Sequence, residues 1–312
     1  MGKEIYFMRK YGIRYFCISV IDKISFSCFK SFERAVMPWR TKMVKRYLKR
    51  VYGEFLNVYD SAEKNKDVIS ENAPIWICWW QGIEDAPLLA KACIKSIQAC
   101  SGSHPVRFID KNSIYNHMEI PDLFIEKAEN GKYPVAVFTD WIRTSLLYQY
   151  GGIWLDITTW MNDSIDVLIK NKSFFTVHHG KFSSWHVSRG KWHNGYFASN
   201  AGDCVMGFVS DMLYQIFLNE EYCMYYLLTD CILSLGYDEV RAIRSEIDSA
   251  EISNCSLLEM QKKMNEVYDQ NLFQMNGDNV INKLSYKGSL HEKTPDGRLT
   301  NYGYLIKEFA GR

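Results

Sequence analysis

A helix, two glycines, a short strand and an acid follow one another between residues 135 and 156, and this order constrains the fold more than any other feature. The segment from Val135 to Tyr150 lacks internal glycine and proline and repeats apolar residues at helical spacing. Gly151 and Gly152 are of the residue type that ends a helix in a left-handed conformation. The apolar run Ile153-Trp154-Leu155 then predicts a buried strand that stops at Asp156.

An acid at the carboxyl end of a buried strand points to a binding site. In open α/β sheets, ligands bind in the crevice at those strand ends, so we expect Asp156 to face a ligand. Asp140 and Arg143 are three residues apart on the preceding helix, which places them on one face and within reach of a shared polar ligand.

The run TDWIRTSLLYQYGGIWLDIT, residues 139–158, resembles the SDxxRxxxLxxxGGxYxDxD signature of sugar-nucleotide glycosyltransferases. It is most similar to the capsular polysaccharide synthesis proteins, which are related to glycosyltransferase family 32 and to the DxD sugar-binding proteins. The resemblance extends from about residue 74 to the end of the chain. It implies an α/β fold of GT-A-like (Rossmann-like) type, with a mainly parallel sheet flanked by helices.

The resemblance also implies roles for these residues. Asp140 and Arg143 would hold the hydroxyls of the donor sugar, and the motif at Asp156 would hold ribose, pyrophosphate and a divalent metal, Mn²⁺ or Mg²⁺, with Asp156 as the metal ligand. Thr158 stands where the signature has its second acid, as in capsule-type relatives, and this departure weakens the expectation of metal affinity. UDP-galactose or UDP-glucose is the expected donor, and its hexose would be transferred with retention of configuration.

The nucleotide base has aromatic candidates at the start of the domain. The apolar run from Ile75 to Trp80 predicts a first strand, followed by a loop at Gln81 that resembles the family's opening WWQG. Trp79 or Trp80 could stack on uracil, an interaction worth about 1–3 kcal/mol, or both could be core residues. Because neighbouring residues on a strand point to opposite sides, we expect only one of the two at the ligand. Near the C-terminus, in a segment like the family's closing segment, Lys287 is the candidate phosphate contact.

The remaining elements alternate between strand and helix, which indicates a mainly parallel sheet. The predicted helices are 87–99, 121–130 and two within 203–235, and the predicted strands are 106–109 and 174–177.

Two segments are candidates for the acceptor side. The stretch 185–200 is rich in Trp, His, Gly and Asn, with Trp192-His193-Asn194 clustered, and is either an acceptor site or a surface loop. Asp230, on a predicted helix with Tyr225 and Tyr226, resembles an aromatic-plus-acid pattern of capsule-type relatives. This makes it either a contact of the acceptor hydroxyl or an ordinary helix-surface acid.

Other metal sites are not expected. His178 and His179 are adjacent on a predicted strand and point to opposite sides, so a structural role is favoured over shared metal binding. The nine cysteines show no Cys-x-x-Cys pair, which argues against zinc and fits a reducing cytosol.

The N-terminal 52 residues are strongly basic, with 13 Lys and Arg against 3 Asp and Glu, whereas the remainder has 24 against 33. Aromatic and aliphatic residues lie between these charges, which is typical of a helix on an anionic membrane surface; the alternative is an arm packed on the body. The longest charge-free run, residues 144–155, is shorter than the ~18 residues that span a bilayer, and no secretory signal or nucleic-acid motif is visible. We predict a basic amphipathic helical arm at 1–73 and a glycosyltransferase domain at 74–312.

These patterns predict a retaining hexosyltransferase of bacterial capsule synthesis. It would move galactose or glucose from a UDP-sugar to a polyprenyl-pyrophosphate-linked saccharide, as a cytoplasmic protein peripheral to the inner face of the plasma membrane. Two alternatives are a non-catalytic protein that binds sugar nucleotides or a membrane surface, and a glycoside hydrolase, which needs two acids about 5–9.5 Å apart.

Overall fold

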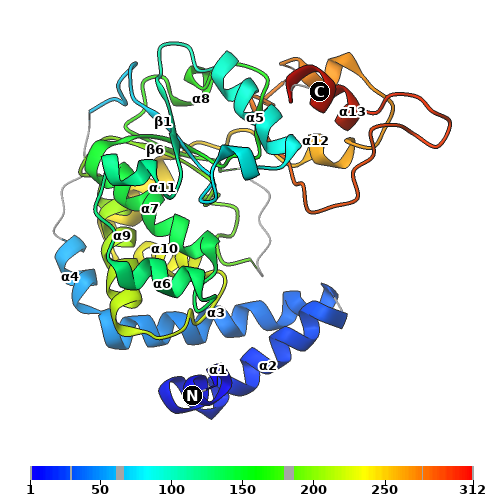
Figure 1. Ribbon diagram of the computed structural model, residues 1–312. Coiled ribbons are helices and arrows are strands. Elements are labelled where there is room, and N and C mark those ends of the chain that lie inside the picture. The colour runs from blue at the N-terminus through cyan, green and yellow to red at the C-terminus, as the bar shows by residue number, and fades with distance from the viewer. Residues whose placement is uncertain (1, 29, 61–66, 179–185, 276, 311–312) are drawn as a thin grey trace.

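The computed structural model describes residues 2–28, 30–60, 67–178, 186–275 and 277–310. Its centre is a five-stranded sheet in the order β2-β1-β3-β6-β5 (Figure 1). The strands are β1 Ile75–Cys78, β2 Val106–Ile109, β3 Gly152–Leu155, β5 Phe174–Thr176 and β6 Tyr196–Ser199. β1 runs parallel to β2 and β3, and β6 is antiparallel to both of its neighbours, so four of the five strands point the same way. The predicted α/β class with a mostly parallel sheet is confirmed.

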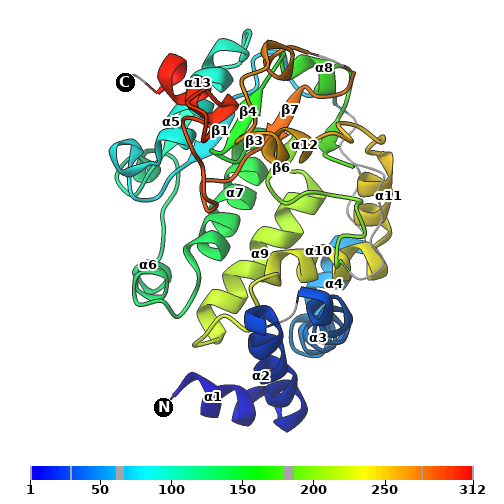
Figure 2. The same ribbon diagram turned by 90° about the vertical axis from the view of Figure 1, so that its right-hand side faces the viewer.

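Both faces of the sheet are buried because alternate residues of each strand enter different cores. Trp76 and Trp154 pack on the side of α7, whereas Ile77 and Leu155 pack on the side of α5. One face is covered by α6 Asp122–Glu129, α7 Val135–Tyr150, α9 Cys204–Asn219, α10 Leu228–Glu239 and α11 Arg241–Ser249, and the other by α5 Leu88–Ala99 and α8 Asp166–Ile169. Figure 2 shows α7 and α9 side by side below the sheet.

The two glycines after α7 are required by their surroundings. Gly151 has φ 66° and Gly152 has φ 110°, a region that disfavours other residues. A Cβ atom on Gly152 would lie 2.5 Å from the carbonyl oxygen of Pro74, where the chain enters β1. The pair therefore turns the chain from helix to strand and lets β3 approach β1.

A second, two-stranded sheet lies beside the first. β4 Thr159–Met161 pairs antiparallel with β7 Ile281–Lys283, and Thr159 is opposite Lys283. After Asp156 the chain turns into this sheet through β4. The surrounding short helices are η1 Ile83–Asp85, η2 Ser113–Asn116, α12 Glu259–Lys262, η3 Gln270–Phe273 and α13 Asn301–Phe309.

Two predicted element boundaries and one predicted loop differ from the structure. β1 ends at Cys78, so Trp79 and Trp80 belong to the loop because the chain turns there toward η1. Tyr225 and Tyr226 precede α10, which begins at Leu228. The stretch 185–200, for which only a site or a loop was considered, contains β6, one of the inner strands of the sheet.

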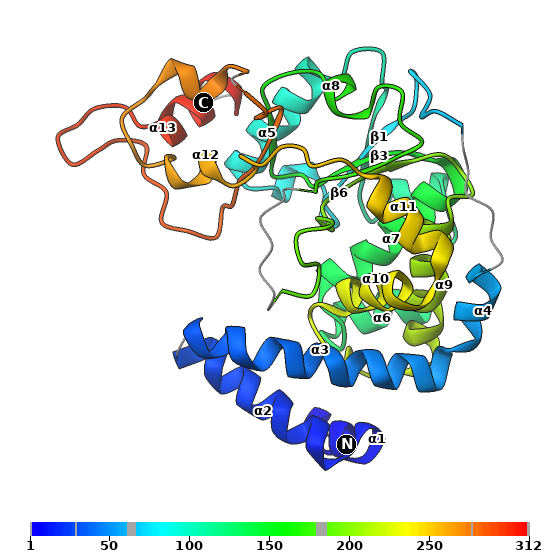
Figure 3. The same ribbon diagram turned by 180° about the vertical axis from the view of Figure 1, so that it is seen from behind.

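The N-terminal arm packs on the body. It consists of α1 Lys3–Tyr11, α2 Ile13–Cys28, α3 Lys30–Tyr52 and α4 Glu54–Asp60, and α3 runs across the molecule beneath α10 (Figure 3). Phe7, Tyr15 and Leu48 are buried in the same core as α9 and α10. Several aromatic residues of the arm thus face the protein, as the packing alternative expected. Within the described parts of the chain, none of the helices has the length and apolarity to cross a bilayer.

One buried acid joins the arm to the body. Glu220, at the end of α9, has a fully buried side chain. Four tyrosine hydroxyls of the arm donate hydrogen bonds to its carboxylate at 2.6–2.9 Å, from Tyr6, Tyr11, Tyr47 and Tyr52. Burial and the neighbouring carboxylate raise the pKa of Tyr6 to about 12, so its hydroxyl remains a donor.

Candidate active site

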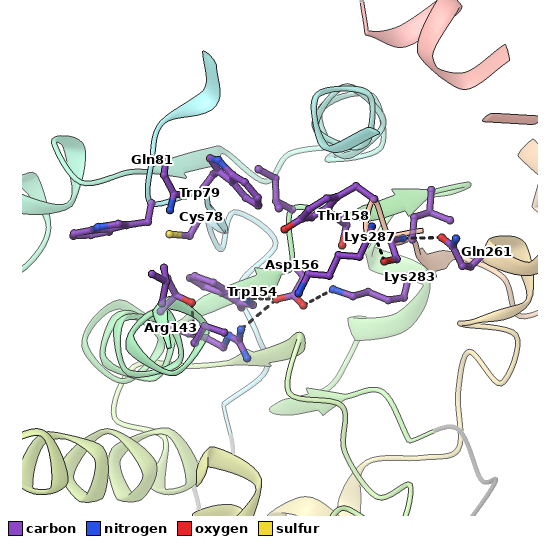
Figure 4. A pocket seen from close by; sticks show the side chains of 18 of the residues that line it. Cys78, Trp79, Gln81, Arg143, Trp154, Asp156, Thr158, Gln261, Lys283 and Lys287 are labelled. Atoms are coloured by element: carbon purple, nitrogen blue, oxygen red, sulfur yellow. Dashed lines mark hydrogen bonds and ion pairs between the residues drawn. The ribbon is translucent and has the colours of Figure 1, made fainter. Parts of the chain in front are cut away.

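A cavity of about 700 Å³ opens at the carboxyl ends of β1 and β3, which are adjacent and parallel (Figure 4). This volume lies within the roughly 300–1,000 Å³ typical of small-molecule sites. Seven of the predicted binding residues line it together: Trp79, Trp80, Gln81, Arg143, Asp156, Thr158 and Lys287. A cavity is therefore present at the carboxyl ends of the strands, where a ligand was expected, and the roles of these residues stay predictions.

Asp156 is directed toward α7 by the alternation of β3. Trp154 and Asp156 are two residues apart and so share the face that α7 covers. The Arg143 guanidinium lies over the Trp154 ring at 4.9 Å and its Nη2 donates to Asp156 Oδ1 at 3.2 Å. On the other side, Lys283 Nζ donates to Asp156 Oδ2 at 2.5 Å. The carboxylate is thus held between two cations.

This environment keeps Asp156 ionised. Burial disfavours its charge, but Lys283 and Arg143 outweigh that effect and hold the pKa of Asp156 far below its usual range. Gly195 packs directly on the carboxylate, because a Cβ atom there would lie 2.5 Å from Asp156 Oδ2. The backbone N–H of Asp156 also donates to the Gly195 carbonyl at 3.1 Å.

Asp140 lies behind Arg143 and does not line the cavity. Its Oδ1 is 3.1 Å from Arg143 Nη2, and its Oδ2 accepts hydrogen bonds from Asn194 at 2.9 Å and Thr229 at 2.7 Å. Only 8 % of the residue is exposed. Burial raises the pKa of Asp140, although Arg143 and the two hydrogen bonds oppose this. Its carboxylate is engaged with protein groups, which fits a role in orienting Arg143.

Asp230 is also buried away from the cavity lining. Its Oδ1 accepts a hydrogen bond at 2.8 Å from the indole Nε1 of Trp192, a residue of the predicted acceptor stretch. Burial, reinforced by the charge of Asp140, raises the pKa of Asp230 to about 6. The alternative of a helix-surface acid does not hold, because the side chain is enclosed between α10 and the Trp192 segment.

The two tryptophans behave differently. Trp80 is buried against Phe138 of α7, with ring centroids 4.8 Å apart. Trp79 is partly exposed and meets Tyr286 edge-on at 5.8 Å, so one aromatic side chain from each end of the domain borders the cavity. Within the described structure, the buried Nε1 of Trp79 has no hydrogen-bond partner, and the Nε of Arg143 has none either.

Lys283 lines the site but was not predicted from the sequence. It reaches Asp156 because β7 pairs with β4 across more than a hundred residues, and neither of these three-residue strands has a clear pattern. The segment like the family's closing segment begins at the next residue, Leu284, which was the available signal. Lys287 is exposed at the rim of the same cavity.

The residues present do not suit a divalent metal. Asp156 is the one acid among the described lining residues, both of its oxygens are paired with cations, and Thr158 offers a hydroxyl in place of a second carboxylate. No cluster of three or more His, Cys, Asp or Glu suited to a metal occurs in the described residues. A doubly charged ion 4 Å from one lysine would be repelled by about 8 kcal/mol at an effective dielectric constant of 20. The divalent metal stays a prediction, and the described lining residues do not supply a set of ligands for it.

The remaining candidates lie around this centre. Asn194 contacts both partners of the ion pair, since its side-chain Nδ2 donates to Asp140 and its backbone carbonyl accepts from Arg143 Nη1. His178 has a structural contact, because its Nδ1 lies 3.1 Å from the Ala250 carbonyl oxygen. His179 lies outside the described residues. Burial raises the pKa of the Cys78 thiol to about 12, so this lining residue is not an activated nucleophile.

Three comparisons with known proteins bear on the family of this chain. A glycosyltransferase named afumC, from Aspergillus fumigatus, is 28 % identical over 111 residues, which cover 33 % of this chain and 28 % of that protein. The solved structure of the PaToxG glycosyltransferase covers 68 % of this chain and 83 % of its own at 15 % identity, with a TM-score of 0.41, a likeness too loose to add to the assignment. The profile of the capsular polysaccharide synthesis proteins matches residues 26–303. The chain therefore belongs to the capsular polysaccharide synthesis protein family.

Proposed function

We propose that this protein is a glycosyltransferase of capsular polysaccharide synthesis that transfers glucose or galactose from a UDP-sugar to a lipid-linked saccharide. The family match and the name of the fungal relative support the enzyme class. The observation that carries the proposal is the line of ion pairs Arg143–Asp156–Lys283 in a cavity at the carboxyl ends of parallel strands, with Trp79 beside it. A GT-A type of fold is part of this proposal.

The reaction explains why cations are needed. The bond between the anomeric carbon and the β-phosphate oxygen breaks, its electron pair stays on UDP, and the acceptor oxygen bonds to the anomeric carbon as the proton of the acceptor hydroxyl passes to water. Negative charge grows on the diphosphate, and preorganised cations in a partly dry cavity stabilise it. We expect Arg143, Lys283 and Lys287, which line the cavity, to supply this stabilisation. Retention of configuration follows from the family resemblance, and we assign no nucleophile.

A donor panel tests the proposal. The full chain is incubated with UDP-, GDP- and CMP-sugars, and release of the nucleotide is measured by chromatography. We expect turnover of a UDP-hexose, slowed by Asp156→Asn because Arg143 and Lys283 are then no longer held in fixed positions by the carboxylate. Absence of turnover with every donor, or an unchanged rate in the variant, contradicts the proposal. Cleavage of a glycoside without any nucleotide would instead favour a hydrolase, which the single acid of the described cavity lining does not support.

A lipid-linked acceptor requires the enzyme to reach a membrane, and the outer face of the arm has suitable residues. Ile5, Met8 and Ile13 are 47, 41 and 66 % exposed, and the arm carries the excess of basic residues. Each Lys or Arg near an anionic surface contributes about 1 kcal/mol. This supports docking of the arm on an anionic leaflet.

Point variants test this docking better than deletion, because deleting the arm would expose the shared core. The triple variant Ile5→Ser, Met8→Ser, Ile13→Ser should co-sediment less with anionic vesicles than the wild type does. Val167→Ser, at a residue 55 % exposed on α8, is the matched control. Binding should also weaken as salt is raised. Equal binding of all three proteins, or equal binding to neutral vesicles, would mean that the arm only packs on the body.

A further inference from the structure

Lys283 is held beside Asp156 by backbone pairing. Thr159, three residues after Asp156, is opposite Lys283 in the β4–β7 ladder, and the N–H of Leu284 donates to the Thr158 carbonyl at 2.9 Å. Figure 4 shows the Lys283 side chain reaching the Asp156 carboxylate, with Lys287 close by. The Lys283 side chain is 25 % exposed, so it borders the cavity and is not sealed in the core.

The cavity carries an excess of positive charge. Its described lining residues include three cations, Arg143, Lys283 and Lys287, and one acid, Asp156. A site built for a divalent metal has the opposite balance, because hard cations need several oxygen ligands and usually more than one carboxylate. An excess of cations suits a ligand that brings its own negative charge, such as a nucleoside diphosphate.

We infer that Lys283 takes the place of a divalent metal in this site and neutralises the diphosphate of the sugar nucleotide, so that binding and turnover need no metal ion. The inference rests on the proposed function, since it names the group that meets the leaving diphosphate. When the bond to the anomeric carbon breaks and its electron pair moves to the β-phosphate oxygen, the Lys283 ammonium stabilises that oxygen by a charge-assisted hydrogen bond. No proton transfer from the lysine is required.

Binding of UDP to the full chain tests this directly. Calorimetry is carried out on protein stripped of metal, once in EDTA and once with manganese chloride. We expect the same UDP affinity in both, and the same rate of UDP release from the sugar donor. Affinity that appears only with manganese would overturn the inference while leaving the proposed function intact. Absence of UDP binding under both conditions would remove the proposed function and, with it, this inference.

Two variants separate the lysine from a metal. Lys283→Gln should weaken UDP binding about 10- to 100-fold, the range for one charged hydrogen bond, whether or not manganese is present. Asp156→Asn should keep or tighten UDP binding, because it releases Lys283 and Arg143 from a competing carboxylate. A metal anchored on Asp156 predicts the reverse, with Asp156→Asn losing manganese-dependent binding.

Lys307→Gln is the matched control, since this exposed lysine of α13 is outside the cavity. It should bind UDP as the wild type does. Thermal unfolding of each variant shows whether a loss of binding reflects loss of the fold. A folded Lys283→Gln protein with wild-type UDP affinity would overturn the inference.

Discussion

The Arg143 guanidinium lies 3.1 Å from the carboxylate of Asp140, three residues earlier on α7. Because the other Asp140 oxygen is engaged by Asn194 and Thr229, this acid is placed to orient Arg143. Asp140→Asn should therefore reduce turnover about 100-fold, in the range for one preorganised charged group, with a much smaller loss of UDP affinity because Lys283 and Lys287 still line the cavity. Separate measurements of kcat and UDP binding check this.

Thr229→Val is the control for that prediction. It removes one of the three contacts of the Asp140 carboxylate and leaves the ion pair with Arg143, so turnover should fall much less. If UDP affinity and turnover fall in equal proportion in Asp140→Asn, the acid contacts the nucleotide instead.

The second prediction concerns Trp79. A base stacked on this ring should lose about 1–3 kcal/mol when the ring is removed, so Trp79→Ala should weaken UDP binding by about 5- to 150-fold. Trp79→Phe retains a flat apolar face and should recover part of the affinity. Trp39, 70 % exposed on the arm, gives the control Trp39→Ala. Wild-type UDP affinity in Trp79→Ala would place the base elsewhere.

The third prediction follows from the pKa of Asp230, which rises from 3.8 to about 6 on folding. The folded state then binds more protons than the unfolded state between those values, so the free energy of unfolding should decrease as pH rises from 3.8 to about 6, by about 3 kcal/mol. Asp230→Asn removes this effect and keeps an oxygen for Trp192. The variant should gain stability over the wild type between pH 4 and pH 7, measured by urea denaturation.

Glu129→Gln, at an exposed acid at the end of α6, should show no such trend. If the stability difference between Asp230→Asn and the wild type is the same at both pH values, burial does not raise the pKa of Asp230 as described.

The fourth prediction tests how the arm is fixed. Glu220→Ala leaves four tyrosine hydroxyls without their acceptor, and an unsatisfied buried group costs about 1–3 kcal/mol. The variant should lower the urea midpoint far more than Tyr47→Phe, which removes one hydrogen bond. Glu221→Ala, at the partly exposed neighbour paired with Lys132, is the control and should have little effect. A small effect of Glu220→Ala would mean that the arm is held by apolar packing alone.

The part of the site near Asp156 was predictable because its causes are local. Helix, glycine pair, strand and acid are consecutive, and alternation along β3 places Trp154 and Asp156 on the face of α7. Lys283 was not predictable, because its position depends on a pairing between two three-residue strands far apart in the sequence. No local pattern encodes such a pairing.

The surface that the arm faces could not be predicted from the sequence. Its tyrosines and phenylalanines between basic residues fit a lipid surface as well as a protein surface, and the pattern contains nothing that separates the two. Tyr47 faces the body because Glu220, 173 residues later, supplies a buried acceptor for its hydroxyl. The β6 strand was missed for a related reason, since its glycine- and asparagine-rich approach resembles a loop.

The Glu220 cluster also has a consequence for geometry. Four hydroxyls, two from α1 and two from α3, converge on the one carboxylate that follows α9, so the arm is fixed against the body by side-chain hydrogen bonds. If the arm docks on a membrane as proposed, the membrane surface lies at a constant distance from Asp156. We then expect the enzyme to favour acceptors whose reactive hydroxyl lies at that same distance from the surface.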